Sequence, residues 1–346
     1  MNAKATWLLV TATATSLALL PATAFADRRH GGSSQGSYET SGSQSGGSLE
    51  SRITFSGAVR GSGGTSTGGV TPVGNWTPPA CWYEPMAAED FAKRTEDGYD
   101  TVVNDPAQPN YAKRATGEFR NMYKDGEYKN YNLDKKDEGN FWVVAQDDSR
   151  LDELAAWNCS ELPFWVENGE TPQVENAVTP QILAELAYNR IQLPTTEVTL
   201  APEGTTKVNL PTWAWLDKAK FKEVSVTAAL NVNGVNMQAT TTARPVSLKI
   251  EPGTSDATTY PASGACAING DDSIGEPYAK GKADRTPPCG VTYLRSSGNG
   301  TFNLRATVTW KITWTGTGTP EPQALPDGTF GNDQAVTVQE IQSVNR

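Results

Sequence analysis

The chain has 346 residues and a formal net charge of −10, because 39 acidic side chains outnumber 29 basic ones. An acidic chain of this kind repels nucleic acid and anionic lipid headgroups, so neither is expected as a partner. The one histidine, His30, lies in a Gly/Ser-rich stretch near the N-terminus, which excludes a Ser-His-Asp or Cys-His apparatus and a His-ligated zinc site from the folded part.

Residues 1–26 have the pattern of a secretory signal peptide. Lys4 supplies a positive charge, residues 7–20 are mostly apolar, and residues 24–26 have the small-x-small pattern that signal peptidase accepts. The apolar run is shorter than the roughly 20 residues that cross a bilayer, so we expect cleavage rather than anchoring. No later segment is long and apolar enough to be an integral membrane segment. The sequence therefore predicts a protein that is secreted or associated with the cell surface.

Residues 27–75 are rich in Gly, Ser and Thr and predict a disordered linker. So little apolar surface cannot offset the entropy lost when a chain becomes ordered. Ile53 and Phe55 are scattered exceptions, and their loose alternation leaves open a short strand that docks on the folded body. That body is expected from Trp76 onward.

Residues 76–194 predict a smaller α+β region with short strands and helices. Its last helix is the clearest, because Thr179 can cap it, Pro180 suits its first position, and apolar residues follow at helical spacing. The preceding elements are expected to be a helix over 86–93, a polar and mostly irregular stretch over 100–140, a buried strand over 141–145, and a helix that Ser149 caps and that runs to Trp157.

Residues 195–346 are all β by pattern. Apolar and polar residues alternate without a fault from Phe302 to Trp314, which indicates a long strand with one buried face. A second alternating unit, residues 224–243, is interrupted by Asn233-Gly234, the signature of a type I′ hairpin turn. One buried and one wet face predict an antiparallel β-sandwich. Further strands are expected over 197–200, 207–210, 245–250, 290–294 and 334–338.

Four cysteines in an exported chain predict two disulfides. The sequential pairing, Cys81 with Cys159 and Cys266 with Cys289, is the simplest of the three possible ones, because each bond then closes within one proposed domain. A metal site is the alternative. It is disfavoured because C-x-x-C spacing and a neighbouring histidine are both missing, so we expect no metal.

The C-terminal region resembles a PKD-type immunoglobulin-like domain. Residues 289–293 (Cys-Gly-Val-Thr-Tyr) and 300–308 (Gly-Thr-Phe-Asn-Leu-Arg-Ala-Thr-Val) match the Gly-x-Tyr-x-Val run that carries the long strand of that family. The Gly-Asp-Gly turn of the family is missing, and residues 248–253 stand in its place. The resemblance implies a PKD-like sandwich over residues 195–346.

The mature chain also resembles a group of secreted actinobacterial proteins without an established activity. The resemblance covers most of residues 76–346 and implies a cell-surface or extracellular setting, with no catalytic residues to transfer. The matching residues are 76–85, 164–169, 178–180, 210–217 and 288–290.

Paired carboxylates are the catalytic arrangement that the composition leaves open, as in glycoside hydrolases. Glu167 and Glu170 flank Asn168-Gly169 beside two aromatic residues, which would suit a sugar site. A solvated acidic turn is the alternative, and it is favoured because carboxylates in loops are common and mostly solvated.

Tryptophan pairs suggest a second kind of site. Trp213 and Trp215 share a face if their stretch is a strand, and exposed coplanar rings would stack on sugars. Core filling is the alternative and the favoured interpretation. It is favoured still more for Trp310 and Trp314, which continue the apolar face of the long strand.

Asp271 and Asp272 lie in an acidic stretch, residues 269–276, whose composition resembles a calcium loop. The spacing of calcium ligands is missing, so a solvated acidic loop is favoured. This stretch belongs to a long segment, residues 251–289, that the Cys266–Cys289 disulfide would order. Because ordered long loops often carry binding function, we treat the segment as a candidate binding surface.

Taken together, these features predict a secreted, non-enzymatic protein of the cell envelope or extracellular space with a binding or structural role. Its expected partner is a cell-wall polysaccharide or a surface protein. No P-loop or G-x-G-x-x-G fingerprint is present, and no cofactor is expected. Two alternatives remain: a carboxylate-based polysaccharide hydrolase, and a subunit of a surface assembly that pairs through an exposed strand edge.

Overall fold

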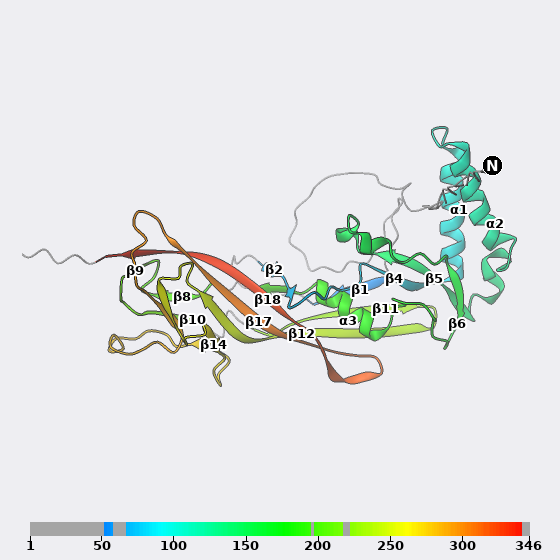
Figure 1. Ribbon diagram of the computed structural model, residues 1–346. Coiled ribbons are helices and arrows are strands. Elements are labelled where there is room, and N and C mark those ends of the chain that lie inside the picture. Colours follow the sequence, from blue (N-terminus) through cyan, green and yellow to red (C-terminus); the bar gives the residue numbers. More distant parts are fainter. Residues whose placement is uncertain (1–51, 58–66, 195–196, 217–221, 341–346) are drawn as a thin grey trace, which may run out of the picture.

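The computed structural model describes residues 52–57, 67–194, 197–216 and 222–340, so the expected signal peptide lies outside the described residues. The molecule is elongated (Figure 1), and three long antiparallel strands run along much of its length. None of the helices in the described ranges is both long enough and apolar enough to cross a membrane. The long strands are β12 (Val235–Glu251), β17 (Phe302–Gly316) and β18 (Thr319–Gln339).

The long strands form the middle of a large sheet with the order β1-β11-β12-β17-β18-β3. Each pair of neighbours on this path is antiparallel. A shift in the pairing of β12 with β17 between Pro245 and Ser247 marks a bulge, which bends the strands. The remaining members of the sheet are β1 (Ile53–Ser56), β3 (Thr71–Pro72), β9 (Thr205–Lys207), β11 (Val224–Val232) and β14 (Ala265–Ala267).

The predicted hairpin is confirmed as β11 and β12. Val232 pairs with Val235, so Asn233 and Gly234 form the two-residue turn. Both residues have positive φ values, 27° and 84°, which is the backbone that a type I′ turn requires and that Asn-Gly adopts readily. The turn thereby fixes the register of the long ladder that follows.

The predicted long strand is confirmed as β17, and its apolar face is buried. Along this strand the buried residues are Leu304, Ala306, Val308, Trp310, Ile312 and Trp314. At one end, Phe302 stacks on Tyr293 with ring centroids 5.3 Å apart. Towards the other end, the strand packs against helix α3 (Pro180–Asn189). A strand of this length therefore serves two different packing partners.

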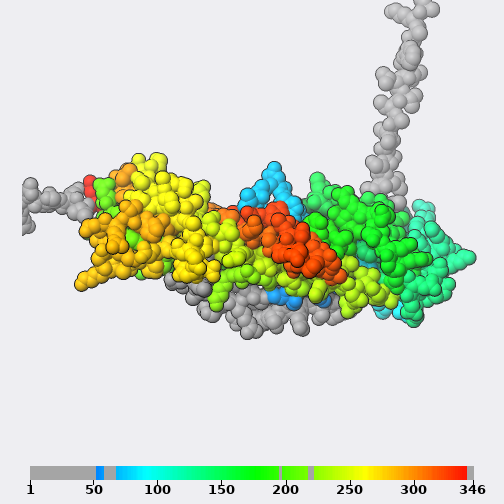
Figure 2. Space-filling model, turned by 90° about the horizontal axis from the view of Figure 1, so that it is seen from below, coloured from blue at the N-terminus to red at the C-terminus, as the bar shows by residue number. Residues whose placement is uncertain are grey.

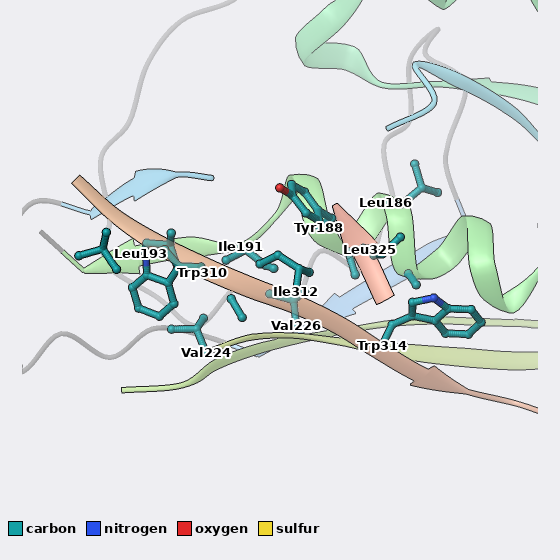
Figure 3. Close-up of a cluster of buried hydrophobic side chains, with 14 of the residues drawn as sticks. Leu186, Tyr188, Ile191, Leu193, Val224, Val226, Trp310, Ile312, Trp314 and Leu325 are labelled. Carbon is teal, nitrogen blue, oxygen red and sulfur yellow. The ribbon is translucent and has the colours of Figure 1, made fainter. Parts of the chain in front are cut away.

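Helix α3 begins as the sequence predicted and ends at Asn189. Thr179 Oγ1 accepts the backbone N–H of Ile182 at 3.2 Å, and Pro180 occupies the first helical position. Figure 3 shows side chains of the α3 stretch, Leu186 and Tyr188, gathered with Ile312 and Trp314 of β17. The helix thus covers the sheet near the middle of the molecule.

A second antiparallel sheet lies at the far end from α1 and α2 (Figures 1 and 2). Its buried residues and those of the large sheet belong to one hydrophobic cluster. The protein is therefore mainly β with antiparallel sheets, as predicted, and the arrangement is compatible with a sandwich. The strands are β8 (Thr199–Ala201), β10 (Thr212–Leu216), β13 (Ala257–Tyr260), β15 (Ile274–Gly275) and β16 (Gly290–Tyr293).

The other end is α+β, as predicted, but it is more helical than expected. The stretch 100–140, predicted to be irregular, instead holds the end of α1, all of α2, and a 3₁₀ turn, η1 (Asn130–Lys135). In α2 apolar residues recur at helical spacing (Ala112, Ala115, Phe119 and Tyr123), although only Tyr123 is buried. The elements at this end are β4 (Cys81–Met86), α1 (Ala88–Asn104), α2 (Asn110–Lys124), β5 (Gly139–Gln146) and β6 (Phe164–Glu167).

Both predicted disulfides are confirmed. Cys81 is bonded to Cys159, with Cα atoms 6.0 Å apart, and Cys266 is bonded to Cys289, with Cα atoms 5.5 Å apart. The first bond joins the start of β4 to the segment that follows β5. The second joins Cys266, within residues 251–289, to Cys289, which directly precedes a strand of the second sheet. Each end of the molecule therefore carries one covalent cross-link.

The expected linker over residues 27–75 contains ordered strands where the structure describes it. β1 pairs with β11, and Ile53 is only 3% exposed opposite Leu230. The backbone N–H of Arg52 donates to the fully buried carboxylate of Glu84 at 2.8 Å, and Trp82 Nε1 donates to the same group at 2.9 Å. Apolar burial and these hydrogen bonds outweigh the Gly/Ser-rich composition around β1.

The predicted boundary after residue 194 does not separate two hydrophobic cores. One cluster joins buried residues of β4, β5 and α3 to those of β11, β12 and β17. Across the boundary, Thr241 Oγ1 donates to the backbone oxygen of Ala184 at 2.7 Å. Strands from both sides also pair, since β3 lies beside β18 in the large sheet. Before the boundary, β2 (Thr67–Gly69) pairs with β7 (Gln192–Pro194). The middle of the molecule is therefore continuous.

Candidate functional site

The two predicted catalytic carboxylates lie at a turn after β6. The backbone N–H of Glu170 donates to the oxygen of Glu167 at 3.1 Å, and both side chains are exposed. Asn168 between them binds inward, donating from Nδ2 to the backbone oxygen of Asp137 at 3.0 Å. This geometry fits a solvated acidic turn, the alternative that the sequence favoured.

The predicted tryptophan platform is covered by the protein itself. Trp213 lies in β10 and is 2% exposed. Tyr278 meets its ring edge-on at 5.9 Å between centroids, and Lys282 Nζ lies 5.3 Å from the ring centroid. Trp215 in the same strand is half-buried. Trp213 therefore fills the core under residues 251–289 and offers no ring face to a sugar.

The two aspartates of the calcium-like stretch form a tight turn. Asp271 Oδ1 accepts the backbone N–H of Ser273 at 3.1 Å and its hydroxyl at 2.6 Å. Asp272 has φ of 63° and lies 3.8 Å from the guanidinium of Arg244. Within the described ranges, no three metal-binding side chains come together. The carboxylates thus stabilise the turn and its contact with β12.

A polar network at the helical end joins α1, α2 and η1 through Glu96. Its carboxylate accepts hydrogen bonds from Arg120 Nε at 2.6 Å, Lys124 Nζ at 2.8 Å and the Tyr131 hydroxyl at 2.7 Å. Burial opposes ionisation of Glu96, but these three hydrogen bonds outweigh it and lower its pKa from 4.5 to about 2. Burial, followed by the bond to Glu96, raises the pKa of Tyr131. The network fixes the helices rather than forming an open site.

A group of large apolar side chains is exposed on residues 147–163, which we call the stapled segment because the Cys81–Cys159 bond ties it to β4. Leu154 is 87% exposed, and Trp157 follows at the fourth position of the 3₁₀ turn η3 (Leu154–Trp157). Residues three apart eclipse one another in such a turn, so the two side chains share a face. Leu151 lies beside them, because Trp157 Nε1 donates to its backbone oxygen at 3.0 Å.

The members of this apolar surface are Leu151, Leu154, Trp157 and, on the way to β6, Leu162, which is half exposed at 50%. Single exposed apolar residues are ordinary, whereas a group on one short segment indicates an interaction site. The segment leaves β5 at the end of the sheet opposite to the start of α1, since Cys81 pairs with Gln146 and Met86 with Phe141. The apolar surface is therefore separate from the helical hairpin (Figure 1).

The stapled segment is held rigidly from beneath. Arg150 forms a two-point contact with Glu153 at 2.9 and 2.6 Å and donates to the backbone oxygen of Pro78 at 2.7 Å. The hydrogen bonding of Arg150 to Glu153 lowers the pKa of Glu153. Gln146 Nε2 donates to the backbone oxygen of the fully buried Ala156 at 2.6 Å. The exposed side chains thus stand on a fixed backbone.

More contacts order the two ends of the segment. At its start, Asp147 caps the 3₁₀ turn η2 (Asp148–Arg150), since its Oδ1 accepts the backbone N–H of Ser149 at 3.1 Å. This corrects the predicted helix, in which Ser149 was the cap and one helix continued to Trp157. At its end, the backbone N–H of Glu161 donates to the Tyr83 hydroxyl at 2.9 Å.

The apolar surface has an acidic border. The stapled segment contains five acidic residues against one basic residue. The basic residue, Arg150, is engaged by Glu153. Asp148, Asp152 and Glu161 are exposed carboxylates close in sequence to the apolar side chains. The site therefore combines an apolar centre with negative charge around it.

Comparison of the chain with protein-family models, with curated proteins and with solved structures found no match. The geometry of the site is therefore the basis for its function. Leu154 and Trp157 were predicted to lie in an ordinary helix, so the apolar surface was not predicted. The available signal was apolar residues at intervals of three, interleaved with acidic ones, in a segment that a predicted disulfide would close.

Proposed function

We propose that this chain is an exported, non-enzymatic protein of the cell envelope or the extracellular space that binds a partner there. The apolar surface of the stapled segment carries the proposal, because exposed leucine and tryptophan on a rigid backbone are typical of binding sites. Single exposed apolar residues are ordinary, and it is the grouping of four on one short segment that indicates binding.

Two further features support the extracellular setting. Two disulfides suit an oxidising compartment, where such bonds persist. The elongated body holds the apolar surface on a scaffold of long strands, an arrangement suited to presenting a binding site at a cell surface. The signal peptide and the likeness to secreted actinobacterial proteins with a PKD-like domain belong to the same proposal.

Retention by the envelope of the producing cells tests the proposed function. Labelled protein lacking residues 1–26 is incubated with intact cells and with isolated envelope, and bound protein is measured against its concentration. We expect saturable retention. The variant Glu167→Gln/Glu170→Gln serves as a matched control and should be retained equally, because both side chains are exposed away from the proposed site.

The same samples distinguish a binding protein from a hydrolase. Reducing ends released from envelope polysaccharide are measured for the wild type and for the double glutamine variant. Absence of saturable retention, together with turnover that the double variant loses, would contradict the proposal and favour the carboxylate mechanism.

A further inference from the structure

We infer that the partner of the apolar surface is a protein whose docking site is apolar at its centre and basic at its border. The inference rests on the proposed function and specifies the chemistry of the partner. It concerns the surface of Leu151, Leu154, Trp157 and Leu162, which the scaffold exposes rather than buries.

Charge complementarity indicates which residues surround the apolar centre of the partner's docking site. Asp148, Asp152 and Glu161 are exposed and close in sequence to the apolar side chains, while the one basic residue of the segment is already engaged by Glu153. Lysine and arginine on the partner would meet these carboxylates, steer the encounter and suppress acidic competitors. A docking site without basic residues would leave the carboxylates partly desolvated and unpaired.

The apolar centre selects a protein over the other classes of envelope component. Leu154 presents a branched aliphatic side chain at 87% exposure, and such groups gain most from a pocket lined by other apolar side chains. Polysaccharides are recognised through aromatic stacking and polar contacts, and only one of the four side chains is aromatic. An anionic membrane surface would be repelled by the acidic border.

The rigidity of the segment favours tight docking. The Cys81–Cys159 bond, the contact of Arg150 with Pro78 and the bond from Gln146 to Ala156 hold the backbone in place before binding. Less conformational entropy is then lost when the partner binds. Trp157 is also fixed by its bond to Leu151, so it acts as a preformed anchor.

A pair of synthetic helical peptides tests the inference directly. Each is about 18 residues long, or five helical turns, with leucines along one face. One carries lysines beside the leucines and the other carries glutamates at the same positions. We expect the protein to bind the lysine peptide at least about tenfold more tightly, with an affinity that falls as salt rises because exposed charges are screened.

Variants locate the binding. Leu154→Ser/Trp157→Ser should weaken binding of the lysine peptide by about tenfold or more, as expected for central apolar anchors. Leu294→Ser is the matched control, because Leu294 is 52% exposed and directly follows β16 of the second sheet, and the affinity of this variant should stay at the wild-type value. Thermal unfolding confirms that the variants fold, which the exposure of the replaced side chains favours.

The outcomes separate this inference from the proposed function. Equal binding of both peptides, or wild-type binding by the double serine variant, would overturn the inference. Normal retention of the double serine variant by the envelope would also overturn the inference, but it would leave the proposed function intact. Loss of retention only in the double serine variant supports both. Absence of retention for the wild type contradicts the proposed function, and the peptide titrations then decide the chemistry of the apolar surface separately.

Discussion

Protonation of Glu96 should loosen the helical end of the molecule as the pH falls from 4.5 towards 2. Glu96 joins α1 to α2 and η1 through Arg120, Lys124 and Tyr131. Burial acts to raise the pKa of Glu96, but the three hydrogen bonds lower it by more. The pKa therefore falls from 4.5 to about 2. Because the folded-state pKa lies below the unfolded one, the stabilisation is complete above about pH 5 and is lost as the pH falls from 4.5 towards 2.

The size of this effect follows from the shift in pKa. A change from 4.5 to about 2 corresponds to an upper bound of roughly 3 kcal/mol, at 1.36 kcal/mol for each pKa unit. The side chain is 31% exposed, and screening by solvent reduces the contribution to about 1–2 kcal/mol. Glu96→Gln retains the shape of the side chain and removes its titration.

Urea unfolding at pH 6 and pH 3 measures the difference. Between these two pH values, the wild type should lose about 1 kcal/mol more stability than Glu96→Gln, since roughly half of the titration lies above pH 3. Glu118→Gln is the control, because the Arg114–Glu118 pair is exposed and 3.9 Å apart, and this variant should follow the wild type. An equal loss in Glu96→Gln and the wild type would refute the assigned role of the network.

Three other changes test the scaffold. Cys81→Ala/Cys159→Ala removes a disulfide with a sequence separation of 78 and should cost about 4 kcal/mol of unfolding free energy by loop entropy, measured by urea unfolding. The same variant should bind the lysine peptide more weakly, which peptide titration measures. Trp310→Ala should cost about 3–5 kcal/mol in the same unfolding assay, because a fully buried indole leaves a cavity. Gly234→Ala should cost about 1–2 kcal/mol in thermal unfolding, since φ is 84° and the new Cβ would lie 3.2 Å from Asn168; an unchanged midpoint would contradict the assigned turn.

The long central strands could be predicted because their signal is local. Every second residue from Leu304 to Trp314 is buried in β17, so alternation in the sequence maps directly onto one face of the sheet. The β11–β12 hairpin has an equally local cause, the positive φ values of Asn233 and Gly234. In both elements, neighbouring residues alone decide the structure.

The helical end could not be predicted because its cause is tertiary. Helix α2 has one buried residue, Tyr123, whose ring meets Phe91 of α1 at 4.9 Å and Phe141 of β5 at 5.8 Å. These contacts join residues far apart in sequence. The local signal is limited to the helical spacing of Ala115, Phe119 and Tyr123 in an otherwise polar stretch. Aromatic packing and the Glu96 network hold this helix.

Strand β18 was largely missed because it begins with prolines. Proline lacks a backbone N–H and is rare in paired strands. Pro320, Pro322 and Pro326 lie in the stretch of β18 before Gly328 and Thr329, the residues that pair with β3. Within the described ranges, this earlier stretch pairs with β17, and a strand at a sheet edge tolerates proline. The same prolines discourage another chain from pairing with this edge, which argues against a surface assembly built through it.

The candidate site escaped prediction for a reason that also supports its role. In the sequence, Leu151, Leu154 and Trp157 look like one face of a packed helix. The contacts that instead turn them outward come from distant residues, namely Cys81 and Pro78. Polar residues at these positions would serve the same backbone without exposing apolar surface to water. Docking of a partner is the role that we propose for these exposed side chains.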